Sequence, residues 1–176
     1  MPRLLDRMIR AAKFDAALYE EVEADRGALG QATLVVVLSS LCAGVGSVHR
    51  AGQIGAVAGT LAALAGWYIW AFLTYWIGTK LLPEPQTHAD FGELLRTIGF
   101  ASAPGVIRIA GVVPGLDGAA FFAAAVWMLA AMILAVRQAL DYTSTLRAVG
   151  VCLIGWLTQI LVMVAVLELL PTSTGS

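Results

Sequence analysis

Long apolar runs separated by short polar segments make up most of the chain. Five runs are long enough to cross a bilayer, at approximately 29–48, 53–79, 94–113, 119–136 and 148–170. About 20 predominantly apolar residues in a helix span the hydrocarbon core. The pattern therefore predicts an all-α integral membrane protein whose domain at 29–170 holds five transmembrane helices. It leaves an N-terminal segment at 1–28 and a short tail at 171–176.

The N-terminal segment alternates apolar and charged positions with helical spacing. Its apolar residues recur on one side, and its cations, Arg3, Arg7, Arg10 and Lys13, share another. A basic face beside an apolar one favours an anionic membrane surface, where each cation adds about 1 kcal/mol. We therefore expect one amphipathic helix from Arg3 to Asp25 that lies on the surface. Its acidic second half is interpreted as a solvated face rather than a docking site.

The third apolar run begins with a helix start and contains a helix breaker. Asp90 and Glu93 have the spacing of an N-cap residue and its partner, whose side chains satisfy free backbone amides. Pro104 removes a backbone donor and disfavours helical geometry at Ala103, so a break is expected over Ala103, Pro104 and Gly105. Lipid cannot satisfy the freed carbonyl, and this predicts that the segment lies inside the bundle.

Arg108 is a cation deep within this apolar run. An arginine in hydrocarbon costs at least about 2.5–3.5 kcal/mol and is usually paired or faces water. The sequence offers Glu168 as its first expected partner and Asp117 as its second. A site for an anion or a lipid headgroup is the alternative. Gln159, at mid-depth in the last run, completes a candidate intramembrane polar cluster of Arg108, Glu168, Asp117 and Gln159.

Composition and charge agree with a membrane protein. Hydrophobic residues make up 59% of the 176 positions and charged residues 13%, with a mean hydropathy of +0.81. Nine cations fall on one side of the predicted membrane and only Arg50 is in a loop on the other, namely Arg3, Arg7, Arg10, Lys13, Arg26, Lys80, Arg96, Arg137 and Arg147. This asymmetry predicts a cytoplasmic N-terminus and an external C-terminus. A net charge of −1 excludes a globally basic nucleic-acid binder.

The sequence contains no recognisable catalytic motif. It has no His-Glu-x-x-His pair, no Gly-x-Ser-x-Gly elbow, no Walker loop and no dinucleotide-binding glycine pattern. Cys42 and Cys152 lie within predicted spans, far apart in sequence, and are interpreted as packing residues. We therefore expect no enzyme activity, cofactor or metal.

Several stretches resemble the bacterial branch of the Yip family, the Ypt/Rab-interacting proteins. These are FDAALYEEVEADRGALGQATLVVVLSSLCAGVG, then TYWIGTKLL and FGELLRTIGFASAPGVI. The resemblance covers roughly 8–166, and it implies a five-span protein of the bacterial inner membrane with a cytoplasmic N-terminus. Eukaryotic relatives act in membrane traffic through Rab-type GTPases and carry a long N-terminal region with an Asp-Leu-Tyr-Gly-Pro segment. This sequence has neither, so the resemblance does not extend to GTPase recruitment.

Three functions fit these observations. The favoured one is a scaffold or adaptor whose cytoplasmic docking face comprises Arg3, Arg7, Arg10, Lys13, Asp90, Glu93 and Arg96. The second is a small channel or transporter with a path near Pro104, Arg108 and Gln159, which requires a homo-oligomer because so few polar residues cannot enclose a path alone. The third is a lipid-interacting protein that shapes the bilayer. The expected partners are the lipid bilayer and either a membrane protein or further copies of the chain, without nucleic acid.

Overall fold

The structure, a computed structural model, describes residues 4–169 and gives side-chain surroundings for 4–47 and 57–161. Every regular element in the described range is a helix, as predicted. The elements are α1 (Leu4–Ala12), α2 (Ala16–Ala24), η1 (Arg26–Ala28), α3 (Leu29–Gly46), α4 (Val48–Trp76), η2 (Ile77–Leu81), α5 (Phe91–Ala101), η3 (Ala103–Val112), α6 (Asp117–Ala139) and α7 (Thr145–Leu169).

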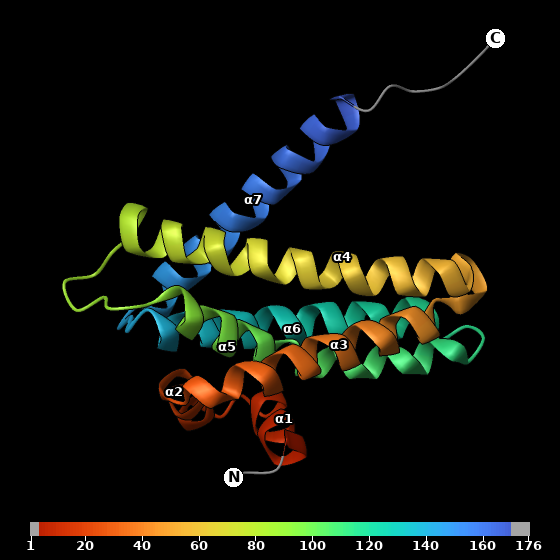
Figure 1. Cartoon of the computed structure of the whole chain (residues 1–176), viewed down its shortest axis with the longest axis horizontal. Coiled ribbons are helices and arrows are strands. Elements are labelled where there is room, and N and C mark those ends of the chain that lie inside the picture. The colour runs from red at the N-terminus through yellow and green to blue at the C-terminus, as the bar shows by residue number, and fades with distance from the viewer. Residues whose placement is uncertain (1–3, 170–176) are drawn as a thin grey trace.

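The long helices α3, α4 and α6 lie roughly alongside one another, and α5 and η3 follow end to end beside them (Figure 1). α7 leaves this bundle at a steep angle. Within the described residues, three helical stretches are long and apolar enough to cross a membrane, at Arg26–Gly46, Val57–Leu81 and Asp117–Ala139. Thr145–Leu161 is a shorter apolar stretch. The long apolar runs thus form helices, as expected of a membrane protein, but the run at 94–113 is divided between α5 and η3, and the five spans stay a prediction.

The N-terminal segment folds into two helices, so the prediction of one continuous helix from Arg3 to Asp25 is wrong. Phe14 has a φ of 60° and interrupts the helix. Asp15 then caps α2, because its side chain accepts a hydrogen bond from the Ala17 amide at 3.1 Å. Trp127, near the middle of α6, donates its indole N–H to the Ala12 carbonyl at 2.8 Å. The end of α1 therefore lies along the flank of the bundle.

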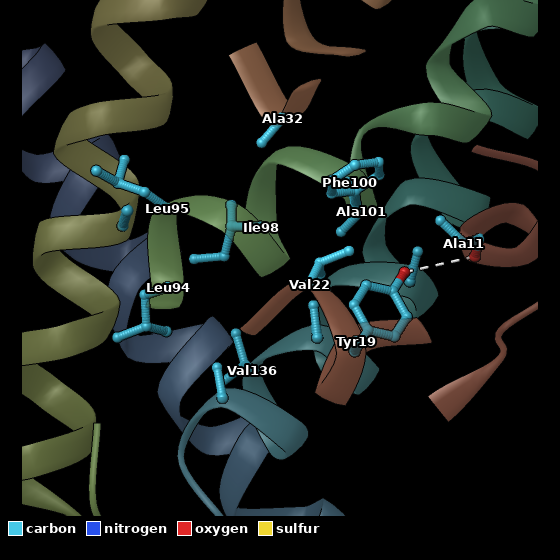
Figure 2. Packing of buried hydrophobic residues seen from close by; sticks show 14 of the residues in the cluster. Ala11, Tyr19, Val22, Ala32, Leu94, Leu95, Ile98, Phe100, Ala101 and Val136 are labelled. Carbon is cyan, nitrogen blue, oxygen red and sulfur yellow. Dashed lines mark hydrogen bonds between the residues drawn. The ribbon is translucent and has the colours of Figure 1, made fainter. Parts of the chain in front are cut away.

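This pair of helices contributes to the main hydrophobic core. Leu18, Tyr19 and Val22 of α2 are fully buried and belong to one cluster with residues of α5 and α6. Figure 2 shows Tyr19 and Val22 packed near Phe100 and Val136. Burial of a large apolar side chain contributes about 1.5–3 kcal/mol. The N-terminal helices are therefore held to the bundle by core packing.

The expected helix start occurs at the predicted residues, and α5 ends just before the expected break. The Asp90 carboxylate accepts from the Glu93 amide at 2.8 Å, and the Glu93 carboxylate accepts from the Asp90 amide at 2.6 Å. α5 ends at Ala101, and the tighter 3₁₀ helix η3 begins at Ala103. Pro104 and Gly105 at its start are buried, which agrees with the expected position inside the bundle.

η3 packs unusually closely against α3. A Cβ on Gly105 would lie 2.0 Å from the Ser39 hydroxyl oxygen, and one on Gly46 would lie 2.0 Å from the Arg108 carbonyl oxygen. Atoms at that distance would overlap. The overlap at Gly46 is with backbone, so that position requires glycine, whereas at Gly105 the nearest atoms belong to the side chains of Ser39 and Met128. This contact sets the position of η3, and with it the position of Arg108.

Candidate functional site

The charged residues of the predicted docking face hold the N-terminal helices together. Arg7 is only 2% exposed and donates to Glu21 at 2.8 and 3.0 Å, to Asp25 at 2.9 Å and to Gln31 at 3.1 Å. Arg10 donates to Asp15 at 2.7 Å and to Glu21 at 2.6 Å. The hydrogen bond from Arg10, and after it that from Arg7, lowers the pKa of the Glu21 carboxyl. Both cations are therefore engaged within the chain.

Arg96 has a similar internal role. Its side chain is 6% exposed, and it donates from Nε to the Val22 carbonyl at 2.9 Å and from Nη2 to the Glu23 carbonyl. Cations near a helix C-terminus satisfy its last carbonyls and oppose its dipole. Lys13 and Asp90 are exposed. Arg3 lies outside the described residues, so its predicted part in the docking face stays a prediction.

An acidic cleft lies between α2, α5 and the end of α6. It has a volume of about 540 Å³ and is lined by Glu20, Glu23, Ala24, Glu93, Arg137, Gln138, Asp141, Tyr142 and Thr143. Four of these nine residues are acids and one is a cation. Burial raises the pKa of Glu23 to about 7, and the nearby negative charges of Glu93, Asp141 and Glu20 add to the effect. The cleft therefore favours a positively charged group.

The loop at 82–90 and the loop at 140–144 form the border of this cleft, and hydrogen bonds join them. Glu84, 8% exposed, accepts from the Thr143 amide at 3.0 Å and hydroxyl at 2.7 Å, and these bonds hold the pKa of its carboxyl at about 2. The Tyr142 hydroxyl lies 3.0 Å from the Gly78 carbonyl and 2.7 Å from the Leu82 carbonyl. Sequence analysis did not identify Glu84 or Tyr142, because nothing local in the sequence shows which loops meet.

A second polar site lies within the bundle. We call it the Arg108 cavity. Its volume is about 190 Å³, and its lining is Val36, Ser39, Ser40, Ala63, Gly66, Trp67, Trp70, Ile98, Ser102, Arg108, Met128, Met132 and Gln159. Arg108 Nη2 lies 3.1 Å from the Met128 sulfur, and its guanidinium carbon lies 5.8 Å from the centre of the Phe121 ring. Met128 is near the middle of α6, so the guanidinium lies deep in the bundle.

The structure brings together two of the four residues of the predicted polar cluster. Arg108 and Gln159 line the same cavity. Asp117, the first residue of α6, is not among its lining residues. The side chain of Glu168 lies outside the described residues, so its predicted pairing with Arg108 stays a prediction. The ion pairs between residues whose side chains the structure describes join α1 to α2 and its flanking residues, and Glu84 to Arg147 at the start of α7. None of those pairs involves Arg108.

Comparison with known proteins gives one match. The model of the Yip1 domain family matches residues 13–167, which is most of the chain. No curated protein and no solved structure matched the chain. The matched range includes most of the N-terminal segment as well as the long helices, in agreement with a shared core.

Proposed function

The chain belongs to the Yip1 domain family, and from this membership we propose that it is a non-enzymatic scaffold or adaptor of the membrane. The acidic cleft is the proposed docking site for a basic segment of a partner membrane protein. The observation that carries the proposal is the position of this cleft. It lies between the acidic half of the N-terminal segment, which the sequence indicated as a solvated face, and the start of α5, which the sequence indicated for docking. Glu20 and Glu23 come from the N-terminal segment, and Glu93 comes from the start of α5.

Electrostatic complementarity supports a cationic partner. Opposite potentials on two surfaces steer their encounter and exclude partners of like charge. A lysine or arginine in the cleft would offset the mutual repulsion of its acids, which adds to the effect of burial in raising the pKa of Glu23. The cleft walls are held by Arg96 on one side and by the Glu84 and Tyr142 hydrogen bonds on the other. A partner would thus bind a preformed surface, at little cost in ordering.

Charge reversal tests this proposal more cleanly than deletion of the N-terminal segment. Deletion would expose the core partners of Leu18, Tyr19 and Val22, which are fully buried, and would disturb the bundle itself. A photo-crosslinking residue at Ala24, which lines the cleft, is expected to capture a discrete partner in native membranes. The same residue at Ala17, which is exposed on α2 and not a lining residue, is the matched control.

The paired substitutions Glu20→Lys and Glu93→Lys are expected to abolish the crosslink from Ala24 at equal protein abundance. An unchanged crosslink in that variant would rule out electrostatic docking in the cleft. Crosslinks of equal strength from Ala17 and Ala24 would indicate contact without a specific site.

We also propose that the chain crosses a bacterial inner membrane five times with its N-terminus in the cytoplasm. The asymmetry of lysine and arginine residues supports this orientation. Single cysteines at Gln86 and at Leu116, both exposed in loops at opposite ends of α5–η3, provide the test in a chain without its two native cysteines. In intact cells, a membrane-impermeant maleimide should label only Leu116→Cys. Labelling of Gln86→Cys alone would indicate the opposite orientation.

A further inference from the structure

The Arg108 cavity contains hydrogen-bond donors without acceptors. Arg108 Nε and Trp70 Nε1 are both fully buried and have no hydrogen-bond partner among the residues whose side chains the structure describes. The protons of two of the cavity's serines are already used, because Ser40 donates to the Val36 carbonyl and Ser102 to the Gly99 carbonyl. An unsatisfied buried donor is unfavourable, and more so when it is charged. Such a pair indicates a site that an acceptor completes.

The lining of the cavity determines the charge of that acceptor. Among the residues whose side chains the structure describes, the lining contains one cation, Arg108, and no carboxylate. Gln159 can add amide N–H groups to those of Arg108 and Trp70. A buried charge is normally paired, and a guanidinium binds an oxyanion with charge-assisted, often bidentate bonds. A cavity of about 150 Å³ accepts a molecule the size of benzene, so about 190 Å³ has room for a carboxylate or phosphate group.

An apolar groove adjoins the cavity and shares Trp70 with it. The groove lies between α4, α6 and α7, has a volume of about 420 Å³ and is lined by Trp70, Ala125, Leu129, Ile133, Val149, Cys152, Leu153 and Trp156. Leu129, Leu153 and Trp156 are each more than half exposed, so the groove opens on the outer surface of the bundle. In a membrane protein that surface faces lipid. A ligand could therefore enter sideways from the bilayer.

One face of α7 connects the two spaces. Cys152 and Trp156 line the groove, and Gln159 lines the cavity, at the four- and three-residue spacings that share a helix face. Gly155 lies between them against the Trp70 ring, where a Cβ would come within 3.3 Å of it. The polar Arg108 cavity and the apolar groove thus adjoin at Trp70, and α7 contributes lining residues to both.

We propose that the Arg108 cavity and the apolar groove together bind a single-chain anionic lipid. Its oxyanion, a carboxylate or phosphate monoester, pairs with Arg108 and accepts from Trp70, and its hydrocarbon chain occupies the groove. The match of charge and polarity supports this occupant. Hydrogen-bond donors converge at one end, and the described residues that line the groove are apolar or aromatic. Arg108 and the headgroup then neutralise each other at a depth where either alone is unfavourable.

Oleate is a suitable probe, with its methyl ester as the uncharged analogue and acetate and inorganic phosphate as headgroups without a chain. Binding to the full chain in a neutral detergent is followed by the rise in the thermal unfolding midpoint and by native mass spectrometry. We expect one oleate per chain, half-saturation weakened at least about tenfold in Arg108→Gln and about threefold in Trp70→Phe. Lys80→Gln, which removes an exposed cation outside the cavity, should bind as the wild type does.

Three results would overturn the proposal. Equal responses of wild type and Arg108→Gln to oleate would place the effect in the micelle rather than in the cavity. Equal half-saturation by acetate or phosphate would indicate a free-anion site without a role for the groove. Binding of oleate only after Glu168→Gln would show that Glu168 already occupies the cavity. Arg108→Gln removes a buried charge, so its fold is expected to persist, and Arg108→Lys provides a second variant that retains the charge.

Discussion

Arg96 on α5 donates a 2.9 Å hydrogen bond to the carbonyl of Val22 at the end of α2, across 74 residues of sequence. The Glu23 carbonyl accepts from the same guanidinium. A single buried cation therefore caps one helix from another and joins the N-terminal helices to the bundle. The same contact holds Glu23 and Glu93 on opposite walls of the acidic cleft.

Replacement of Arg96 is expected to release the N-terminal helices. Arg96→Met keeps much of the side-chain volume but leaves two backbone carbonyls of α2 without a charged donor, at a cost of about 2–4 kcal/mol. Hydrogen exchange should rise across residues 16–24 and stay unchanged in α6. Arg147→Met, at a half-exposed arginine in the first turn of α7, is the control. Equal protection of α2 in Arg96→Met and wild type would contradict the capping role.

The acidic cleft is expected to make stability depend on pH. The pKa of Glu23 is raised to about 7, so the folded chain binds this proton more tightly than the unfolded chain does. The protonated Glu23 carboxyl therefore favours the folded state. This contribution to stability is complete below the ordinary pKa of a glutamate and is lost as the pH rises towards 7. Glu23→Gln should therefore unfold at a higher temperature than wild type at pH 8 and at nearly the same temperature at pH 5.

The expected gain at pH 8 is about 1 kcal/mol, since Glu23 is only half buried and solvent screens part of the repulsion. Asp6→Asn, at an exposed acid of α1, serves as the control. If the unfolding temperatures of Glu23→Gln and wild type differ more at pH 5 than at pH 8, the predicted pH dependence is wrong.

The close contact between α3 and η3 predicts that Gly46 cannot be replaced. In Gly46→Ala the new methyl would meet the Arg108 carbonyl oxygen, so backbone must move and η3 must shift. A loss of at least about 2 kcal/mol is expected, together with weaker oleate binding because Arg108 is displaced. Gly30→Ala in the same helix meets no atom within 4 Å and should stabilise by up to about 1 kcal/mol. Equal thermal midpoints of the two variants would refute this contact.

The Tyr142 hydroxyl is expected to hold the end of η2 in place. Tyr142→Phe removes hydrogen bonds to the Gly78 and Leu82 carbonyls, at a cost of about 1–3 kcal/mol because Tyr142 is 4% exposed. Tyr68→Phe, at a tyrosine that is 46% exposed, is the matched control. The thermal midpoint should fall only in Tyr142→Phe, and an equal effect in both variants would contradict the assignment.

The elements of the fold could be predicted because they depend on local chemistry. Apolar runs gave the long helices, the spacing of Asp90 and Glu93 gave the start of α5, and Pro104 gave the change from α-helix to 3₁₀ helix. Each of these features depends on interactions within a few residues of the chain. The division of the N-terminal segment into two helices was not predicted. It depends on a positive φ at Phe14, and a bulky residue such as phenylalanine rarely adopts one, so the sequence did not indicate it.

The sequence by itself determined that this is a helical membrane protein with a proline break and a cation deep in an apolar run. Only the tertiary structure decided which charges remain available. Arg7 and Arg96 form hydrogen bonds within the chain. Glu20, Glu23 and Glu93 instead line a cleft. Arg108 lines a cavity together with Trp70 and Gln159. The reason is physical: a charge is neutralised by whichever group lies within a few ångströms, and those neighbours come from segments far apart in sequence.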